Sequence, residues 1–402
     1  MNQEEDIEES VISSDSTGFS PGQASLCYQT RSGRTYEHWI KGACKVQNHP
    51  LFQGKIHSSE KPPMFKRVVS LFFLICLTGC TGVPAITSTP QPFRRGDGSE
   101  LVFSYCDKPY CLKPTPSIQN PAFSPDGRLV LYTVFWKGYN QGSAGIYRLL
   151  LADGIIYPLL NESGYVAANV SGSSWNATTR RIAFASNRRS ADEQWSEIWV
   201  VNDDGSYLHR VTSHLTPEDF IAPTFSPEGE WLVFEARPTA NALPAASCLW
   251  KVRVNGADLT PLTADASADD QRPNWSPTGE WIVFQRRLPG KTDYDIYLMT
   301  PDGRQIQPLA TSPADEVDAA WSPDGRWIVY SSTNGELTTP GLYLLPATGG
   351  TPQRLTHDDA HSDSAPTWSP DGRWIVFASR AVTEPDLPTT LWRIAVPELP
   401  LR

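Results

Sequence analysis

Two histidines and several carboxylates near the C-terminus are the residues best suited to bind a metal. The segment reads His357-Asp358-Asp359-Ala360-His361 and is followed by Asp363. Imidazole and carboxylate groups are ligands for divalent transition metals. His357 and His361 are therefore candidate metal ligands, and a divalent metal is the one cofactor that the sequence suggests. The competing interpretation is a pair of exposed histidines in a polar loop, with no cofactor.

Carboxylates also recur in the connections that precede four of the repeated segments described below. They include Asp219, Asp270, Asp318 and Asp363. If these connections share one rim of a ring, the carboxylates would converge on a channel mouth and attract cations or basic segments. The alternative is that they are solvated residues at turns and strand starts.

Residues 64–80 have the layout of an export signal. Lys66 and Arg67 precede a run of roughly ten apolar residues, which is too short to span a bilayer. The run ends in Leu77-Thr78-Gly79-Cys80, which resembles a bacterial lipobox. The resemblance implies cleavage before Cys80 and attachment of a diacylglycerol to its thiol. A buried helix with an incidental cysteine is the alternative.

The stretch upstream of this signal, residues 1–63, shows no periodic apolar pattern. Met64 stands where a signal peptide would begin, which favours translation from Met64 and a mis-assigned start. A disordered cytoplasmic tail is the alternative. We therefore exclude 1–63 from the fold and expect a signal peptide over 64–79 and a lipidated tether over 80–97.

The composition favours short strands joined by tight turns. The 402 residues include 35 Pro, 28 Gly and 14 Trp but only 19% charged residues, which argues against a helical bundle. The net charge of −10 argues against nucleic acid as a partner.

Export permits a disulfide between Cys106 and Cys111, which are close enough in the sequence to close a small loop. Cys248 alternates with apolar residues and is expected to be a buried core thiol.

The chain repeats itself from residue 120 onward. Each copy has an aromatic residue, a turn such as Ser-Pro-Asp-Gly and an apolar run such as Trp-Ile-Val-Phe. The aromatic residues lie 52, 50, 50, 46 and 47 positions apart and are Phe123, Trp175, Phe225, Trp275, Trp321 and Trp368. The copy at Trp175 is degenerate. A fixed period near 49 predicts a repeat architecture in which no unit buries its apolar faces alone.

Each copy predicts four antiparallel strands. Ser-Pro-Asp-Gly suits a type I turn, and the fully apolar run after it suits a strand covered on both faces. A second hairpin follows, with Asp-Gly or Asn-Gly at its turn in several copies. Six such units predict an all-β fold, a six-bladed β-propeller over 98–402. Because the last copy lacks a fourth strand, we expect Leu101–Tyr105 to supply it and to close the ring.

The Ser-Pro-Asp-Gly and Arg-Trp-Ile-Val-Phe units resemble those of the TolB-like propellers, whose repeats are also called WD-like. Five of the six copies match well. The motif encodes turns and core, so it specifies the fold better than the function. The resemblance implies an exported protein that serves as an envelope binding scaffold. TolB carries an α/β domain before its propeller, and the short segment between Cys80 and Phe123 leaves no room for one. Partnership with the Tol-Pal system is therefore not implied.

We accordingly expect a monomeric, lipid-anchored, non-catalytic binding module on the extracytoplasmic side of a bacterial membrane. Its partner would be an envelope protein, or a peptide or glycan held at the channel mouth or on the loops that carry Trp136, Tyr139 and Trp195. The alternative is a polysaccharide lyase or hydrolase with a metal on the propeller face, as in propeller lyases that act on pectin fragments. The sequence contains neither a Gly-x-Ser-x-Gly elbow nor a His-Glu-x-x-His motif, so it names no catalytic residue.

Overall fold

The computed structural model describes the chain as two separate units, residues 1–87 and 88–402. The described residues are 23–29, 35–41, 93–105, 116–161, 165–169, 172, 174–188, 195–213, 218–238, 246–263, 268–333, 339–383 and 388–399. In the first unit they form one antiparallel hairpin, β1 (Gln23–Gln29) and β2 (Thr35–Lys41). The proposed signal peptide at 64–79 lies outside the described residues. No helix of the described part is long and apolar enough to cross a membrane.

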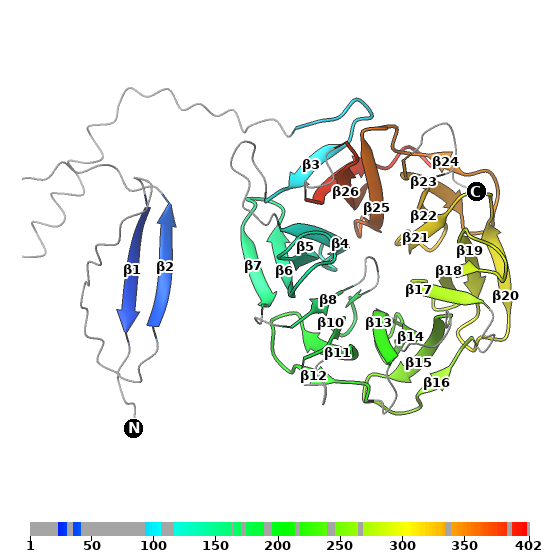
Figure 1. Ribbon diagram of the computed structural model, residues 1–402, viewed down its shortest axis with the longest axis horizontal. Coiled ribbons are helices and arrows are strands. Elements are labelled where there is room, and N and C mark those ends of the chain that lie inside the picture. The colour runs from blue at the N-terminus through cyan, green and yellow to red at the C-terminus, as the bar shows by residue number, and fades with distance from the viewer. Residues whose placement is uncertain are drawn as a thin grey trace, which may run out of the picture. The chain divides into compact units, whose positions relative to one another are not determined.

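The second unit is a ring of six β-sheets, the blades, arranged around a central channel (Figure 1). Blade 1 contains β4 (Ser117–Phe123), β5 (Leu129–Phe135), β6 (Ala144–Leu150) and β7 (Ile156–Leu160). Blade 2 contains β8 (Ala167–Ala168), β9 (Trp175–Asn176), β10 (Arg181–Ser186), β11 (Glu197–Asn202) and β12 (His209–Arg210). Blade 3 contains β13 (Glu218–Phe225), β14 (Trp231–Pro238), β15 (Cys248–Arg253) and β16 (Thr260–Pro261).

The remaining blades repeat this plan. Blade 4 contains β17 (Asp269–Trp275), β18 (Ile282–Arg287), β19 (Asp295–Met299) and β20 (Ile306–Ala310). Blade 5 contains β21 (Glu316–Trp321), β22 (Trp327–Ser332), β23 (Gly341–Pro346) and β24 (Gln353–Arg354). Blade 6 contains β25 (His361–Trp368), β26 (Trp374–Ala381) and β27 (Thr390–Ala395), and β3 (Glu100–Phe103) is its fourth strand. The predicted fold of antiparallel four-stranded blades is confirmed; blade 2 departs from it because its innermost strand is broken into β8 and β9.

The predicted Ser-Pro-Asp-Gly turns join the first two strands of the regular blades. In blade 5, the N–H of Gly325 donates to the carbonyl of Ser322 at 2.9 Å, and the Ser322 hydroxyl donates to Asp324 at 2.6 Å. Gly325 has a φ of 70°, a conformation that glycine adopts at little cost. The apolar run after the turn is buried from Ile328 onward, as expected for a strand packed on both sides.

Each regular innermost strand has a β-bulge three residues before its aromatic anchor. The bulged residue has a positive φ and is Asn120, Ala222, Arg272, Asp318 or Ala365. A bulge inserts one unpaired residue and re-aims the backbone. The N–H groups released in this way are used to connect the blades, as described below.

Strand β3 closes the ring by pairing with β27, so the two ends of the unit share one sheet. The register joins Leu391 with Phe103 and Arg393 with Glu100. Arg393 also donates two hydrogen bonds to the Glu100 carboxylate, at 3.0 and 2.7 Å. The predicted closure is confirmed. Figure 1 shows β3, in cyan, beside the red and brown strands of the C-terminal blade.

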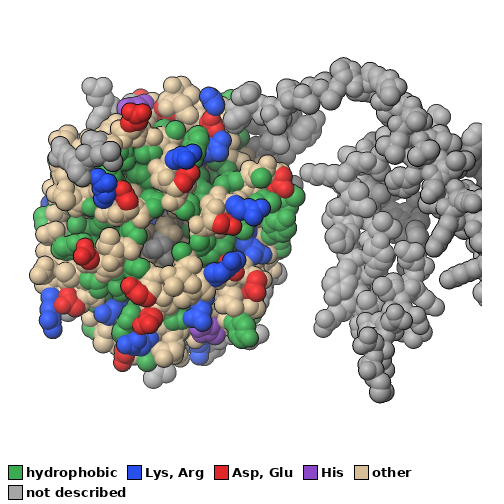
Figure 2. Space-filling view, turned by 180° about the vertical axis from the view of Figure 1, so that it is seen from behind, with side chains coloured by type: hydrophobic (Ala, Val, Ile, Leu, Met, Phe, Trp, Pro, Cys, Tyr) green, Lys and Arg blue, Asp and Glu red, His purple; other side chains and the backbone are tan. Residues whose placement is uncertain are grey.

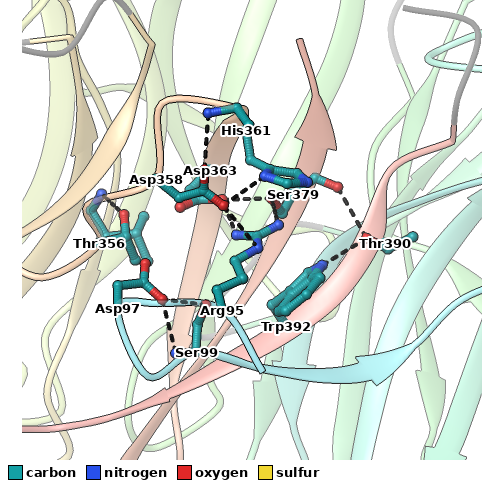
Figure 3. Close-up of polar contacts among 12 residues, drawn as sticks. Arg95, Asp97, Ser99, Thr356, Asp358, His361, Asp363, Ser379, Thr390 and Trp392 are labelled. Atoms are coloured by element: carbon teal, nitrogen blue, oxygen red, sulfur yellow. Dashed lines mark hydrogen bonds and ion pairs between the residues drawn. The ribbon is translucent and has the colours of Figure 1, made fainter. Parts of the chain in front are cut away.

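Residues 93–97, which we predicted as part of the tether, lie on blade 6. The side chain of Arg95 is only 4% exposed, and its guanidinium lies 3.7 Å from the centre of the Trp392 ring. It also contacts Asp363 at 3.2 Å and the Ser379 hydroxyl at 2.8 Å (Figure 3). Asp97 accepts hydrogen bonds from the backbone and hydroxyl of Ser99, which holds the turn that follows Arg95. The propeller therefore begins before residue 98.

We expect Arg95→Met to destabilise the propeller by about 3–5 kcal/mol, because the substitution leaves the Asp363 charge buried without its cation. The double variant Arg95→Met, Asp363→Asn should regain part of this loss, since no buried charge remains. Urea unfolding followed by tryptophan fluorescence measures both free energies. Arg373→Met is the matched control, because the Arg373 side chain is 79% exposed. If Arg95→Met were no more destabilising than Arg373→Met, Arg95 would not hold the ring closed.

Candidate functional site

The central channel has two differently lined mouths. One, of about 380 Å³, is surrounded by the aromatic anchors and Ser-Pro turns, including Trp275, Pro277, Trp321 and Pro323. The other, of about 360 Å³, lies among the strand starts of blades 4 to 6 and is lined by arginine, aspartate, glutamine, tyrosine and serine side chains. Ligand sites combine concavity with a few well-placed polar groups. The second cavity, here called the polar mouth, is therefore the better candidate site.

Blade 2 narrows the channel near the first of these mouths. A Cβ atom added to Gly172 would lie 2.1 Å from the amide nitrogen of Asn274 in blade 4. Gly172 has a φ of 88°, a conformation that favours glycine, and an added Cβ atom would also displace the Asn274 amide.

A belt of side chains connects blades 3 to 6 at the polar mouth. In blades 4, 5 and 6 the N–H of the bulged residue donates to a side chain of the preceding blade: Arg272 to Glu235, Asp318 to Gln285, and Ala365 to Asp318, at 3.4, 3.2 and 3.1 Å. Arg272 also forms an ion pair with Asp318 at 2.9 Å. These contacts fix the polar groups before any ligand arrives, which lowers the entropic cost of binding.

Arg380 supplies a positive charge to the polar mouth. It lies on β26, and its guanidinium stands 4.9 Å from the centre of the Tyr139 ring, which comes from the loop between β5 and β6. Tyr139 is 46% exposed. No ion pair or hydrogen bond involves the Arg380 side chain within the described part of the chain. Arg380 is thus available to an anionic group that enters the cavity.

Tyr294 and Asp315 form the opposite wall. The Tyr294 hydroxyl donates to Asp269 at 2.6 Å, and the Tyr294 N–H donates to Asp315 at 3.0 Å. Burial tends to raise the pKa of Asp269, but the bonds from Tyr294 and from the Ser247 N–H, together with the charge of Arg287, hold it below its ordinary value. Asp315 is exposed, so the mouth presents groups of both charges. On the face drawn in Figure 2, hydrophobic and uncharged side chains border the central hollow, and acidic and basic side chains lie farther out.

The structure does not gather the four predicted rim carboxylates at one open mouth. Asp318 does line the polar mouth. Asp219 is half-buried and accepts the Ser196 N–H at 2.7 Å. Asp270 and Asp363 are buried and bound by Arg286 and Arg95, because carboxylates withdrawn from water require a cationic partner. Asp270 and Asp363 occupy the same position of their strands, and the side chains at this position lie between blades rather than at the channel.

The two predicted metal ligands lie at the start of blade 6, where His361 is the first residue of β25 and His357 precedes it in the β24–β25 connection. His361 is half-buried and its Nδ1 is 2.7 Å from an oxygen of Asp358, which also contacts Arg95 at 3.4 Å (Figure 3). His357 is exposed, and its backbone N–H donates to Asp97 at 3.2 Å. In the parts of the chain that the structure describes, no three or more His, Cys, Asp or Glu side chains are grouped to hold a metal ion. The metal site stays a prediction.

The aromatic residues and cysteines singled out in the sequence differ in how far they are exposed. Trp136 packs against Tyr105 and Tyr147 rather than standing open to ligands, whereas Tyr139 lines the polar mouth. Trp195 is half-buried. Cys248, expected in the core, is half-buried at its edge, and its sulfur accepts a hydrogen bond from the Trp250 indole. Cys80, Cys106 and Cys111 lie outside the described residues, so lipidation and the disulfide stay predictions.

The sequence analysis missed the arginines of the polar mouth. Arg272 and Asp318 occupy the same position of successive repeats, three residues before the aromatic anchor, where other copies have Asn120, Ala222 and Ala365. A comparison of the repeats at this one position would have singled them out. Arg380 carried no such signal, because its neighbour Tyr139 is 241 positions away in the chain.

Three solved structures are similar to part of this chain. Among solved structures, the chain is similar to a putative TolB from Agrobacterium tumefaciens, with 17% identity, a TM-score of 0.47, and coverage of 70% of this chain and 90% of that one. It is also similar to an oligogalacturonate lyase from Vibrio parahaemolyticus, with 14% identity, a TM-score of 0.47, and coverage of 77% and 97%. TolB from Acinetobacter baumannii shares 14% identity, with a TM-score of 0.47 and coverage of 70% and 63%.

No curated protein sequence matches the chain. The family model for the TolB beta propeller domain matches it in two overlapping stretches, residues 109–335 and 264–388. Together these stretches cover residues 109–388, which include strands of every blade but not β3 and β27 of blade 6. The chain therefore belongs to the TolB beta propeller domain family.

Proposed function

We propose that this protein is a lipid-anchored binding module of the bacterial cell envelope, which holds a partner at the polar mouth without catalysing a reaction on it. The observation that carries this proposal is the fixed array of polar side chains around the cavity. Arg272 and Asp318 neutralise each other, while Arg380 and the exposed Asp315 remain accessible to a ligand.

A polypeptide segment of an envelope protein suits this cavity best. Such a segment carries charges of both signs along a backbone of donors and acceptors. Gln271, Gln285 and Ser364 line the cavity and supply hydrogen-bonding groups, while Arg380 supplies the cation for a carboxylate. A cavity of about 360 Å³ accommodates a few residues of a partner rather than a large surface.

The extracytoplasmic location rests on the lipobox-like sequence at Cys80 and on the family. TolB-like propellers are exported proteins, and the basic residues followed by an apolar run at 64–79 would direct export here as well. A lipid on Cys80 would place the propeller at the membrane surface within reach of membrane-associated partners.

Replacement of Arg380 should weaken partner binding. Loss of a charge-assisted hydrogen bond reduces affinity by about tenfold or more, so we expect Arg380→Gln to lose partners that wild type retains. The measurement is affinity capture of the full-length membrane-associated protein from its native envelope, followed by quantitative mass spectrometry. Arg304→Gln is the matched control, because Arg304 is 86% exposed on the β19–β20 turn and paired with Asp302. Equal capture by all three proteins would remove the polar mouth as the binding site.

The lipid anchor can be tested separately. Cys80→Ser removes the thiol that would be acylated, so the variant should move from the membrane fraction to the soluble fraction, whereas Cys248→Ser should remain with the membrane. Fractionation with immunoblotting and mass spectrometry of the mature N-terminus give the result. Retention of Cys80→Ser in the membrane fraction would contradict lipid anchoring but not binding at the polar mouth.

A further inference from the structure

The innermost strands of five blades place one residue at the same position against the preceding blade. In each case its N–H donates to a backbone carbonyl of that blade; the pairs are Ile118 with Thr389, Phe220 with Ser196, Asp270 with Ser247, Glu316 with Tyr294, and Asp363 with Pro340. All five side chains are buried, and three of them are carboxylates. A buried carboxylate is costly unless a cation compensates its charge.

Two of the three carboxylates have a cation supplied by the chain. Asp270 pairs across its sheet with Arg286, which donates two hydrogen bonds to it at 2.6 and 2.8 Å. Asp363 pairs with Ser379 instead, and here the N-terminal segment brings in Arg95 as the cation. The same acidic position is therefore compensated in blades 4 and 6 by arginines from unrelated parts of the sequence.

Glu316 is the third carboxylate, and its cross-strand partner is also a serine, Ser332. One carboxylate oxygen accepts hydrogen bonds from Ser312 and Ser332. The other oxygen, Oε2, is buried and has no hydrogen-bond partner. No lysine or arginine forms an ion pair with Glu316 within the described residues. Burial and the negative charge of Asp295 raise the pKa of Glu316 to about 7.

Asp295, at the start of β19, is the second acid of this cluster. Its side chain is 1% exposed; one oxygen contacts Lys291 at 3.1 Å, and the other, Oδ1, is buried without a partner. In blade 2 the corresponding acid, Glu197, accepts a hydrogen bond from Thr212. Ala310 stands at the threonine position in blade 4, so Asp295 lacks that donor. Two adjacent buried carboxylates thus each keep one oxygen available.

We infer that Glu316 and Asp295 together bind an oxygen-liganded divalent cation of the Ca²⁺ type between blades 4 and 5. The cation would compensate the buried negative charge of Glu316, as Arg286 compensates that of Asp270 and Arg95 that of Asp363. Ca²⁺ prefers hard oxygen ligands, with carboxylates first among them. The Ser312 and Ser332 hydroxyls lie beside Glu316, and water would complete the coordination. The site is distinct from His357 and His361 and adjoins the polar mouth, which Ser332 also lines.

The test is the response of the EDTA-treated full-length protein to Ca²⁺ alone. We expect Ca²⁺ to raise the Tm of wild type by about 3 °C or more at concentrations well above Kd, and calorimetric titration to give one site. Glu316→Gln and Asp295→Asn should lose both responses. Glu280→Gln, an exposed control, should keep them.

A second variant covers the case in which those substitutions impair folding. Ser332→Arg copies blade 4, where Arg286 packs against Phe284 and Tyr297; blade 5 offers Tyr330 and Tyr343 at these positions. This variant should be folded in EDTA and insensitive to Ca²⁺. A wild-type protein that binds no Ca²⁺ would overturn the inference, and so would an undiminished response in Glu316→Gln and Asp295→Asn.

Discussion

Ring closure is the constraint on which the rest of this structure depends. No blade buries both of its faces alone, so every sheet relies on its neighbours and the last must be joined to the first. Strand β3 completes blade 6, and Arg95 enters the same blade to compensate the buried Asp363.

The spaces between blades impose a second requirement, the compensation of buried charge. The repeat places a buried acidic residue at the same position in blades 4, 5 and 6, and the groups around its carboxylate differ in each blade. Arg286 is local to its blade and Arg95 comes from more than 250 positions away in the sequence, whereas Glu316 has no arginine or lysine partner among the described residues and is affected by the negative charge of Asp295. Comparison of equivalent positions within one chain thus singles out Glu316 as the carboxylate of this set that has no arginine partner among the described residues.

The polar mouth follows from the bulges of the innermost strands. In blades 4, 5 and 6 the bulge turns one N–H toward the preceding blade, where Glu235, Gln285 or Asp318 accepts it. These bonds hold Arg272 and Asp318 in place and leave the wall of the cavity rigid. Because Arg272 and Asp318 line the cavity, the residue at the bulged position sets part of the lining of the polar mouth.

The sequence by itself determined the number of blades, their strands, their turns and the closing strand. These features depend on local turn chemistry and on periodic apolar residues, both of which are visible in each repeat. The sequence did not determine which charged residues meet. The contact of Arg380 with Tyr139, the burial of Arg95 and the paired acids Glu316 and Asp295 join residues from different repeats or loops. Only the closed ring brings such residues together, because their distances depend on the geometry of all the blades and not on any local pattern.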